Sequence, residues 1–481
     1  MRLNKFSDVT FLFISLTLTS FSILLIFKLC DYGFDFTDEG YYLLSAKYAN
    51  ELPYKISYFD HLSSFLFNLF HENISFFRRG NIIFTLLIGI NLTYICFSGS
   101  SIRLNFLSND RFFRFSIIFL IASNFLNLIS KVKIITPSYN SYSIHALILI
   151  ASAIFLNSRD KFFSFFKTFL LVSGLIILIL SKLTSAFAVI LICLLYSQTL
   201  DYQNKKIIYI SLVLSLMISI FIILSINNYS IHELFFRLKR SLELYDILKS
   251  NHSIRGMQTV IASSIFSMKF IYFICLILWT LSNFLILKTC NVLINKKKFD
   301  ISFALKISPL LIVFIFPNNE VLELGFYFSL PIALFLITLY TKEYRNCISK
   351  QDIYQMIFIL ALPFCFVLGT NTNYFVSLMR ASTFILLASF LYVLKLIFIV
   401  NKNKLKRNLK KFLIYSSLIS SLFIYQSIVD ININPYRQTP NLLGNNDLFA
   451  FGPSGSKLLL SKEFYSYLEN ISSEIQKNGF I

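Results

Sequence analysis

Apolar stretches long enough to cross a bilayer recur along the whole chain, and this repetition restricts the fold more than any other feature. Residues 9–30 form the first stretch and residues 412–429 form the last. About 20 apolar residues in a helix span the hydrocarbon core of a membrane, where the backbone must satisfy its own hydrogen bonds. A hydrophobic content of 56% also exceeds that of ordinary soluble domains. The sequence therefore predicts an all-α, polytopic integral membrane protein.

We predict about thirteen membrane-spanning helices, several of them short. They cover residues 9–30, 81–97, 112–130, 141–155, 166–180, 183–196, 207–226, 270–287, 301–316, 324–340, 354–368, 374–400 and 412–429. The first stretch is longer than the apolar part of a signal peptide and no small-residue cleavage site follows it, so we expect a retained anchor. The spans make one transmembrane domain over residues 1–429, and residues 430–481 form a short tail.

The net charge of +20 is explained by the positions of the basic residues. They gather in alternate loops between predicted spans, which hold Arg103, Arg111 and Arg114; Arg159, Lys161 and Lys167; Lys205 and Lys206; Lys296, Lys297 and Lys298; Lys342, Arg345 and Lys350; and Lys402, Lys404, Lys406, Arg407, Lys410 and Lys411. The positive-inside rule makes this side cytoplasmic, together with the amino terminus. The charge thus orients the chain in a membrane and does not indicate binding to nucleic acid.

With an odd number of spans, the first loop, residues 31–80, and the carboxy-terminal tail lie on the external side. We expect the protein in the bacterial inner (plasma) membrane. The seven cysteines stand singly within or at the ends of spans, which indicates neither a disulfide framework nor a metal cluster.

The first external loop opens with two adjacent acids, Asp38 and Glu39. Carboxylates are costly to keep partly dehydrated near a bilayer, so a role such as accepting a proton or binding a metal is one interpretation. The plain alternative is a helix start, with Thr37 as N-cap and both acids favoured by the helix dipole. The sequence alone leaves both open.

Two helices that lie at the membrane interface are predicted in the same loop. The first covers residues 38–50, and the second covers residues 62–70 and is too short to span. Joined by a polar turn, they would bring the acid pair close to Asp60 and His61. We therefore expect a polar cluster at the depth of the lipid headgroups.

The segment that carries these residues, TDEGYYLLSAKYANELPYKISYFDH, resembles the first external loop of GT-C-fold glycosyltransferases. That class includes the protein O-mannosyltransferases and the lipid A aminoarabinose transferases. The resemblance is strongest over residues 36–67, and the number of spans and the outward tail extend it loosely to the whole chain. It implies an enzyme that moves a sugar from a polyprenyl-phosphate donor to a hydroxyl of a lipid, glycan or protein acceptor, with inversion at the anomeric carbon.

In such an enzyme Asp38 would act as general base on the acceptor hydroxyl, and Glu39 would assist by orienting the acceptor. Tyr42 follows the acid pair and is a candidate for contact with the substrate. The resemblance implies no cofactor. A divalent cation on these oxygen ligands would be Mg²⁺ or Mn²⁺, but we assign no residue as a metal ligand.

The leaving lipid phosphate needs cations or hydrogen-bond donors close by. Some relatives have a lysine after the second acid of the loop, whereas here His61 follows Asp60. Lys182, between two predicted spans, and Arg380, within an apolar stretch, are the alternatives, although a snorkelling lysine would look the same. In the next external loop Tyr139 and Asn140 are candidates for binding a sugar hydroxyl, or simply part of a turn.

The tail, residues 430–481, contains a segment rich in Asn, Pro and Gly and then a predicted helix over residues 461–477. Residues 452–457 only superficially match a phosphate-binding loop, and we interpret them as a turn.

Two other functional classes stay open. A flippase or transporter of a lipid-linked saccharide should show internal repeats or acids inside its spans, and this sequence shows neither. A protein related to O-antigen polymerases or ligases would carry its key arginines in later external loops.

Overall fold

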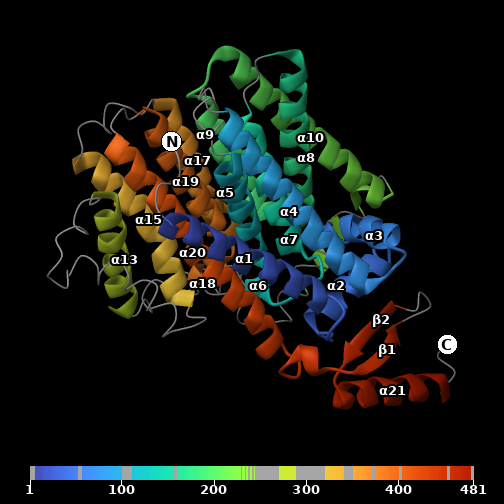
Figure 1. Ribbon diagram of the computed structural model, residues 1–481. Helices are drawn as coiled ribbons and strands as arrows, with labels where there is room; N and C mark the ends of the chain where they lie inside the picture. The colour runs from blue at the N-terminus through green and yellow to red at the C-terminus, as the bar shows by residue number, and fades with distance from the viewer. Residues whose placement is uncertain are drawn as a thin grey trace.

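The computed structural model describes residues 6–51, 57–99, 111–156, 160–228, scattered positions within 230–243, and then 270–288, 320–340, 350–369, 374–399, 403–451 and 456–477. The main bundle, shown in Figure 1, is made of α1 (Phe6–Leu29), α4 (Ile74–Gly99), α5 (Arg111–Ser123), α6 (Asn127–Val132), α7 (Tyr139–Phe155), α8 (Lys161–Ser181), α9 (Leu183–Ser197), α10 (Tyr202–Ile226), α13 (Phe270–Lys288), α15 (Glu320–Tyr340), α17 (Lys350–Val367), α18 (Tyr374–Arg380), α19 (Thr383–Ile399) and α20 (Asn403–Ile433). A single 3₁₀ turn, η3 (Asn124–Leu126), joins α5 to α6.

Six of the described helices are long and apolar enough to cross a membrane, which supports a helical membrane protein. They cover Val9–Leu29, Ile74–Phe97, Phe112–Val132, Lys161–Ser181, Tyr202–Ile226 and Asn408–Ile433. Five shorter apolar helices occupy further predicted spans: Tyr139–Phe155, Leu183–Ser197, Glu323–Thr338, Gln351–Val367 and Thr383–Ile397. The count of thirteen is not confirmed, and the predicted span 301–316 lies outside the described residues.

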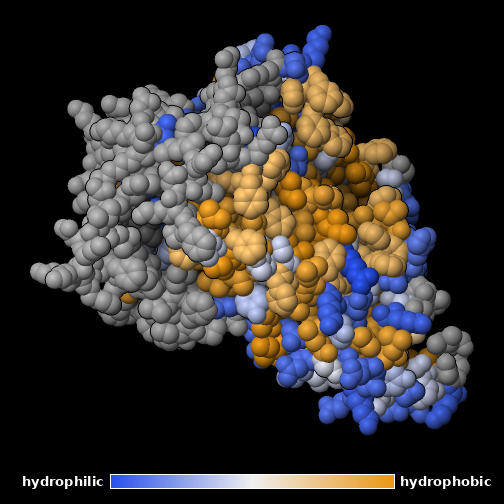
Figure 2. Space-filling model, viewed as in Figure 1, coloured by the Kyte–Doolittle hydropathy of each residue, from blue (hydrophilic) through white to orange (hydrophobic). Residues whose placement is uncertain are grey.

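The surface of the bundle is apolar around its middle. Large hydrophobic side chains such as Phe187 and Phe221 are mostly exposed. In Figure 2 hydrophobic residues occupy the middle of the visible face, and hydrophilic ones lie toward the tail and toward the opposite end. A belt of this kind matches contact with lipid.

Two short helices stand between α1 and α4, as the sequence predicts: α2 (Asp38–Lys47) and α3 (Phe59–Leu69). They lie at the end of the bundle where α1 and α20 finish, which we call the loop end (Figure 1). Helix α4 begins at Ile74, seven residues before the predicted span 81–97, and so includes Arg78 and Arg79.

The protein is nearly all helical, in line with the predicted fold class, and its described strands are confined to the tail. After the 3₁₀ turn η4 (Leu442–Gly444), β1 (Asp447–Phe451) pairs antiparallel with β2 (Ser456–Leu460), and α21 (Lys462–Lys477) follows where a helix was predicted. Residues 452–455, between the strands, lie outside the described part of the chain.

Main-chain hydrogen bonds dock the tail on the bundle. The Gly33 N–H donates to the Leu459 carbonyl at 2.8 Å, and the Leu459 N–H donates to the Asp31 carbonyl at 2.8 Å. Gly33 has a φ of +66°, and a Cβ there would lie 2.1 Å from Gln438 Oε1, so only glycine lets the tail approach this closely. The tail thereby covers the first loop.

Candidate functional site

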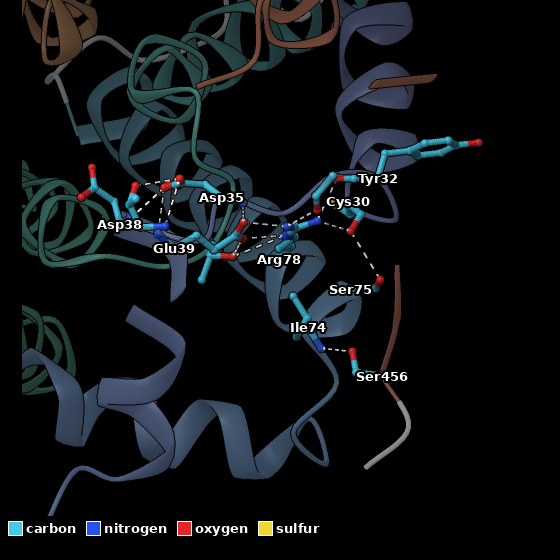
Figure 3. A network of polar contacts seen from close by, with 12 residues as sticks. Cys30, Tyr32, Asp35, Asp38, Glu39, Ile74, Ser75, Arg78 and Ser456 are labelled. Atoms are coloured by element: carbon cyan, nitrogen blue, oxygen red, sulfur yellow. Dashed lines mark hydrogen bonds and ion pairs between the residues drawn. The ribbon is translucent and has the colours of Figure 1, made fainter. Parts of the chain in front are cut away.

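Glu39 and Arg78 form a buried ion pair beneath the first loop (Figure 3). Arg78 donates from Nε to Glu39 Oε1 at 2.9 Å and from Nη2 to Glu39 Oε2 at 2.8 Å, a bidentate geometry. Only 3% of either side chain is exposed. The rest of the guanidinium donates to the carbonyls of Cys30, Tyr32 and Gly33. This arginine therefore fixes the end of α1, the start of α2 and the start of α4 to one another.

The Glu39 carboxylate accepts further hydrogen bonds. The Thr136 hydroxyl donates to Oε1, and the Asp35 N–H donates to Oε2 at 3.1 Å. Thr136 belongs to the loop before α7, so Glu39 also ties that loop to α2. With both oxygens engaged and buried, the carboxylate has the surroundings of a structural anchor.

Asp35 caps α2. Its Oδ2 accepts the backbone N–H groups of Asp38 at 2.8 Å and Glu39 at 3.2 Å. The Thr37 side chain makes no capping bond, and its hydroxyl donates to Asp35 Oδ1 at 2.7 Å. The prediction of Thr37 as the capping side chain is therefore wrong, because an acid two residues earlier takes over the orphan N–H groups.

Asp38 has a different environment from its neighbour. Its side chain is directed away from Arg78 in Figure 3 and is 44% exposed. Arg437 Nη1 lies 3.9 Å from Asp38 Oδ1 and donates to the Thr37 hydroxyl at 2.7 Å. The guanidinium also lies over the Tyr436 ring at 4.8 Å from its centroid. Asp38 is thus an accessible carboxylate with an exposed cation beside it.

Tyr436 also reaches Asp38, through a side-chain hydrogen bond. Burial raises the pKa of the Tyr436 hydroxyl, and the bond and charge of Asp38 raise it further. Tyr436 therefore stays a neutral donor. Sequence reasoning missed both Tyr436 and Arg437, because they lie about 400 residues from the acids and only the docking of the tail brings them close.

Aromatic rings form the inner wall behind Asp38. Tyr42 packs edge-on against Phe59 at 5.9 Å between ring centroids and against Tyr139 at 6.3 Å. Burial is the main cause of a raised pKa of the Tyr42 hydroxyl, and Tyr139 and Asp38 add to it. The structure thus brings Tyr42 close to Asp38 and packs a second predicted residue, Tyr139, against Tyr42.

Asn140 lies beside Tyr139 in the first turn of α7, whose start Ser138 caps. Its side chain is buried, and its Oδ1 has no hydrogen-bond partner in the described part of the chain. A buried amide oxygen left in this state is a candidate acceptor for a ligand hydroxyl once the site opens.

Asp60 and His61 form a second group on α3. His61 Nε2 lies 3.9 Å from Asp60 Oδ2; Asp60 is buried, and 18% of the His61 side chain is exposed. The His61 ring lies 6.3 Å from the Tyr58 ring. Asp60 contributes to a raised pKa of Tyr41, whose main cause is burial, so the second group faces α2.

Lys182 and Arg380 make a third group. Lys182 is the residue that connects α8 to α9, and its Nζ donates to the Phe366 carbonyl and lies over the Phe366 ring. Burial, and then the charge of Arg380 at the end of α18, lower the pKa of Lys182 to about 7. The Tyr58 N–H donates to the Leu180 carbonyl at 2.7 Å, which joins this group to the second one.

Within the described residues, no cluster of three or more His, Cys, Asp or Glu side chains is arranged to hold a metal ion. A scan against protein-family models finds no match, and searches of curated proteins and of solved structures find no similar chain either.

Proposed function

We propose that this protein is a membrane glycosyltransferase that moves a sugar from a polyprenyl-phosphate donor to an acceptor hydroxyl on the extracytoplasmic face. The observation that carries the proposal is the division of the acid pair. The Glu39 carboxylate is buried in an ion pair with Arg78. The Asp38 carboxylate is accessible and lies beside the neutral hydroxyls of Tyr42 and Tyr436 and the guanidinium of Arg437. An acid in the first turn also favours α2 through the helix dipole, so the support for a role in chemistry comes from the tyrosines and the cation around Asp38.

Asp38 would accept the proton of the acceptor hydroxyl as the oxygen forms its bond to the anomeric carbon. The bond from that carbon to the phosphate oxygen breaks at the same time, so the sugar inverts and polyprenyl phosphate leaves with the electron pair. Lys182 and Arg380 are the cations we assign to the phosphate, because they lie close enough for the charge of Arg380 to lower the pKa of Lys182, and two neighbouring cations suit a phosphate group. Glu39 becomes a positioning residue that holds α2 in place.

The proposal is tested with Asp38→Asn in purified, lipid-reconstituted protein. The assay follows release of polyprenyl phosphate from polyprenyl-phosphate-linked hexoses with an acceptor present. We expect loss of about a thousandfold or more in turnover, because general-base catalysis supplies roughly 10²–10⁴-fold and the amide cannot take the proton.

Asp31→Asn is the matched control, because Asp31 is an acid of the same loop that pairs with Arg79, outside the proposed site. Its turnover should stay within about twofold of the wild type, since exposed ion pairs contribute little. Full turnover by Asp38→Asn would refute the assignment. Transbilayer movement of the lipid-linked sugar without chemical transfer would favour the flippase instead.

A further inference from the structure

A pocket of about 550 Å³ lies between the first loop and the tail. Residues 33–37 form one wall, and residues 437–440 with the first turns of α21 form the other. Small-molecule sites in proteins have this size and combine apolar walls with a few polar groups. The pocket adjoins Asp38, because Arg437 lines it and is also the cation 3.9 Å from that carboxylate.

Aromatic rings give the pocket flat apolar surfaces. Phe464 and Tyr467, one turn apart on α21, are nearly parallel, with 6.2 Å between ring centroids and 20° between planes. Tyr467 is 51% exposed, and Phe36 on the opposite wall is 57% exposed. Both exposed rings line the same pocket, so their apolar surfaces are available to a ligand there.

Polar groups stand around these rings. Arg437 offers guanidinium donors, Glu463 offers carboxylate acceptors, and Gln438 offers an amide. Gln438 Oε1 is enclosed and has no hydrogen-bond partner in the described part of the chain. A sugar ring has an apolar C–H face and an edge of hydroxyls that both donate and accept, so it matches flat rings bordered by mixed polar groups. An isoprenoid chain has no use for these charges.

We infer that this pocket binds the saccharide end of the acceptor and presents its hydroxyl to Asp38 past Arg437. This inference rests on the proposed function, because only a glycosyltransferase would make the bound saccharide an acceptor. The binding of a saccharide by the pocket can be measured without donor or turnover.

The experiment measures binding of methyl glucoside, methyl galactoside, methyl mannoside and N-acetylglucosamine to the full-length protein in nanodiscs, by saturation-transfer NMR. At least one of them should bind the wild type. Tyr467→Ala should weaken that binding about tenfold, the effect of one good contact. Glu463→Gln should weaken the binding as well. The first variant removes an aromatic ring and the second removes a charge, so the two measure these contributions separately.

Ile475→Ala, a change on the same helix outside the pocket, is the control and should bind like the wild type. The inference is overturned if none of the four sugars binds the wild type, or if Tyr467→Ala and Glu463→Gln both bind as well as it does. If the pocket binds sugar but no polyprenyl-phosphate hexose is ever turned over, the saccharide site stands and the proposed function fails.

Discussion

Asp38 and Glu39 are adjacent and chemically alike, and they differ in role only because different side chains surround them. The sequence could not assign those partners, because Arg78 lies 39 residues from Glu39 and outside the predicted span. One signal was present: Arg78 and Arg79 lie in the loop that we predict to be external, where the positive-inside rule leads us to expect few bases. Arginines in such a place are expected to be held by carboxylates.

Glu39→Gln is expected to destabilise the fold by about 3 to 5 kcal/mol, because it leaves Arg78 as a buried charge without a counter-ion. Thermal unfolding in detergent measures this as a lowered midpoint. Replacing both residues with leucine should recover part of the loss, since the uncompensated charge is then gone. Asp38→Asn, at an exposed position one residue away, should stay within about 0.5 kcal/mol of the wild type. A Glu39→Gln variant as stable as the wild type would contradict the structural role.

Lys182 gives the proposed enzyme a pH dependence. Its pKa is lowered to about 7, below the ordinary lysine value, so the folded protein carries this cation below pH 7 and loses it as the pH rises. Binding of the donor phosphate then requires uptake of a proton, and the donor KM should rise about tenfold per unit above pH 7.

Lys182→Arg is the control, because a guanidinium stays protonated throughout this range. Steady-state kinetics from pH 6 to pH 9 should give a flat donor KM for that variant. A flat profile in the wild type as well would remove Lys182 from the phosphate site.

At the scale of elements, local sequence patterns predicted whether a segment is a helix better than they predicted where the helix begins and ends. Apolar stretches predicted the positions of α7, α8, α9 and α10 closely, because a long run of apolar residues is by itself enough to identify a membrane helix. The two short helices predicted in the first loop also exist, although α2 ends at Lys47, three residues earlier than expected. Its start at Asp38 matches the prediction, but the capping side chain is that of Asp35 and not that of Thr37: several polar residues precede the helix, and only the backbone path selects one.

The tail hairpin was missed although its pattern is present. Two five-residue segments, Asp447–Phe451 and Ser456–Leu460, flank the sequence Gly-Pro-Ser-Gly, and this pattern is a hairpin signal. The strands are stable because β2 also bonds to the segment after α1, and that long-range contact has no local signature. The tail, and with it Arg437 and the saccharide pocket, could be found only from the fold.

At the scale of the whole molecule, cations differ between the two ends of the bundle. At the loop end the described pairs include Arg78 with Glu39, Arg79 with Asp31, and Lys133 with Asp430. At the opposite end Lys161 begins α8, and Lys205 and Lys206 lie in the first turns of α10; the residues that cap these helices, Asp160 and Asp201, are acids. Structural pairing explains the first set, and the second set is the basis on which the positive-inside rule predicts that this end is cytoplasmic.

This orientation predicts which residues an impermeant maleimide reaches in intact cells. Ser466→Cys on α21 should be labelled from outside, and Gln203→Cys at the start of α10 only after the membrane is permeabilised, because both positions are exposed and lie at opposite ends. The four described cysteines are buried, and the other three, Cys275, Cys290 and Cys347, are replaced by serine so that only the new thiol reacts. The reverse labelling pattern would place Asp38 and the tail in the cytoplasm, and an external transfer reaction would then be impossible at this site.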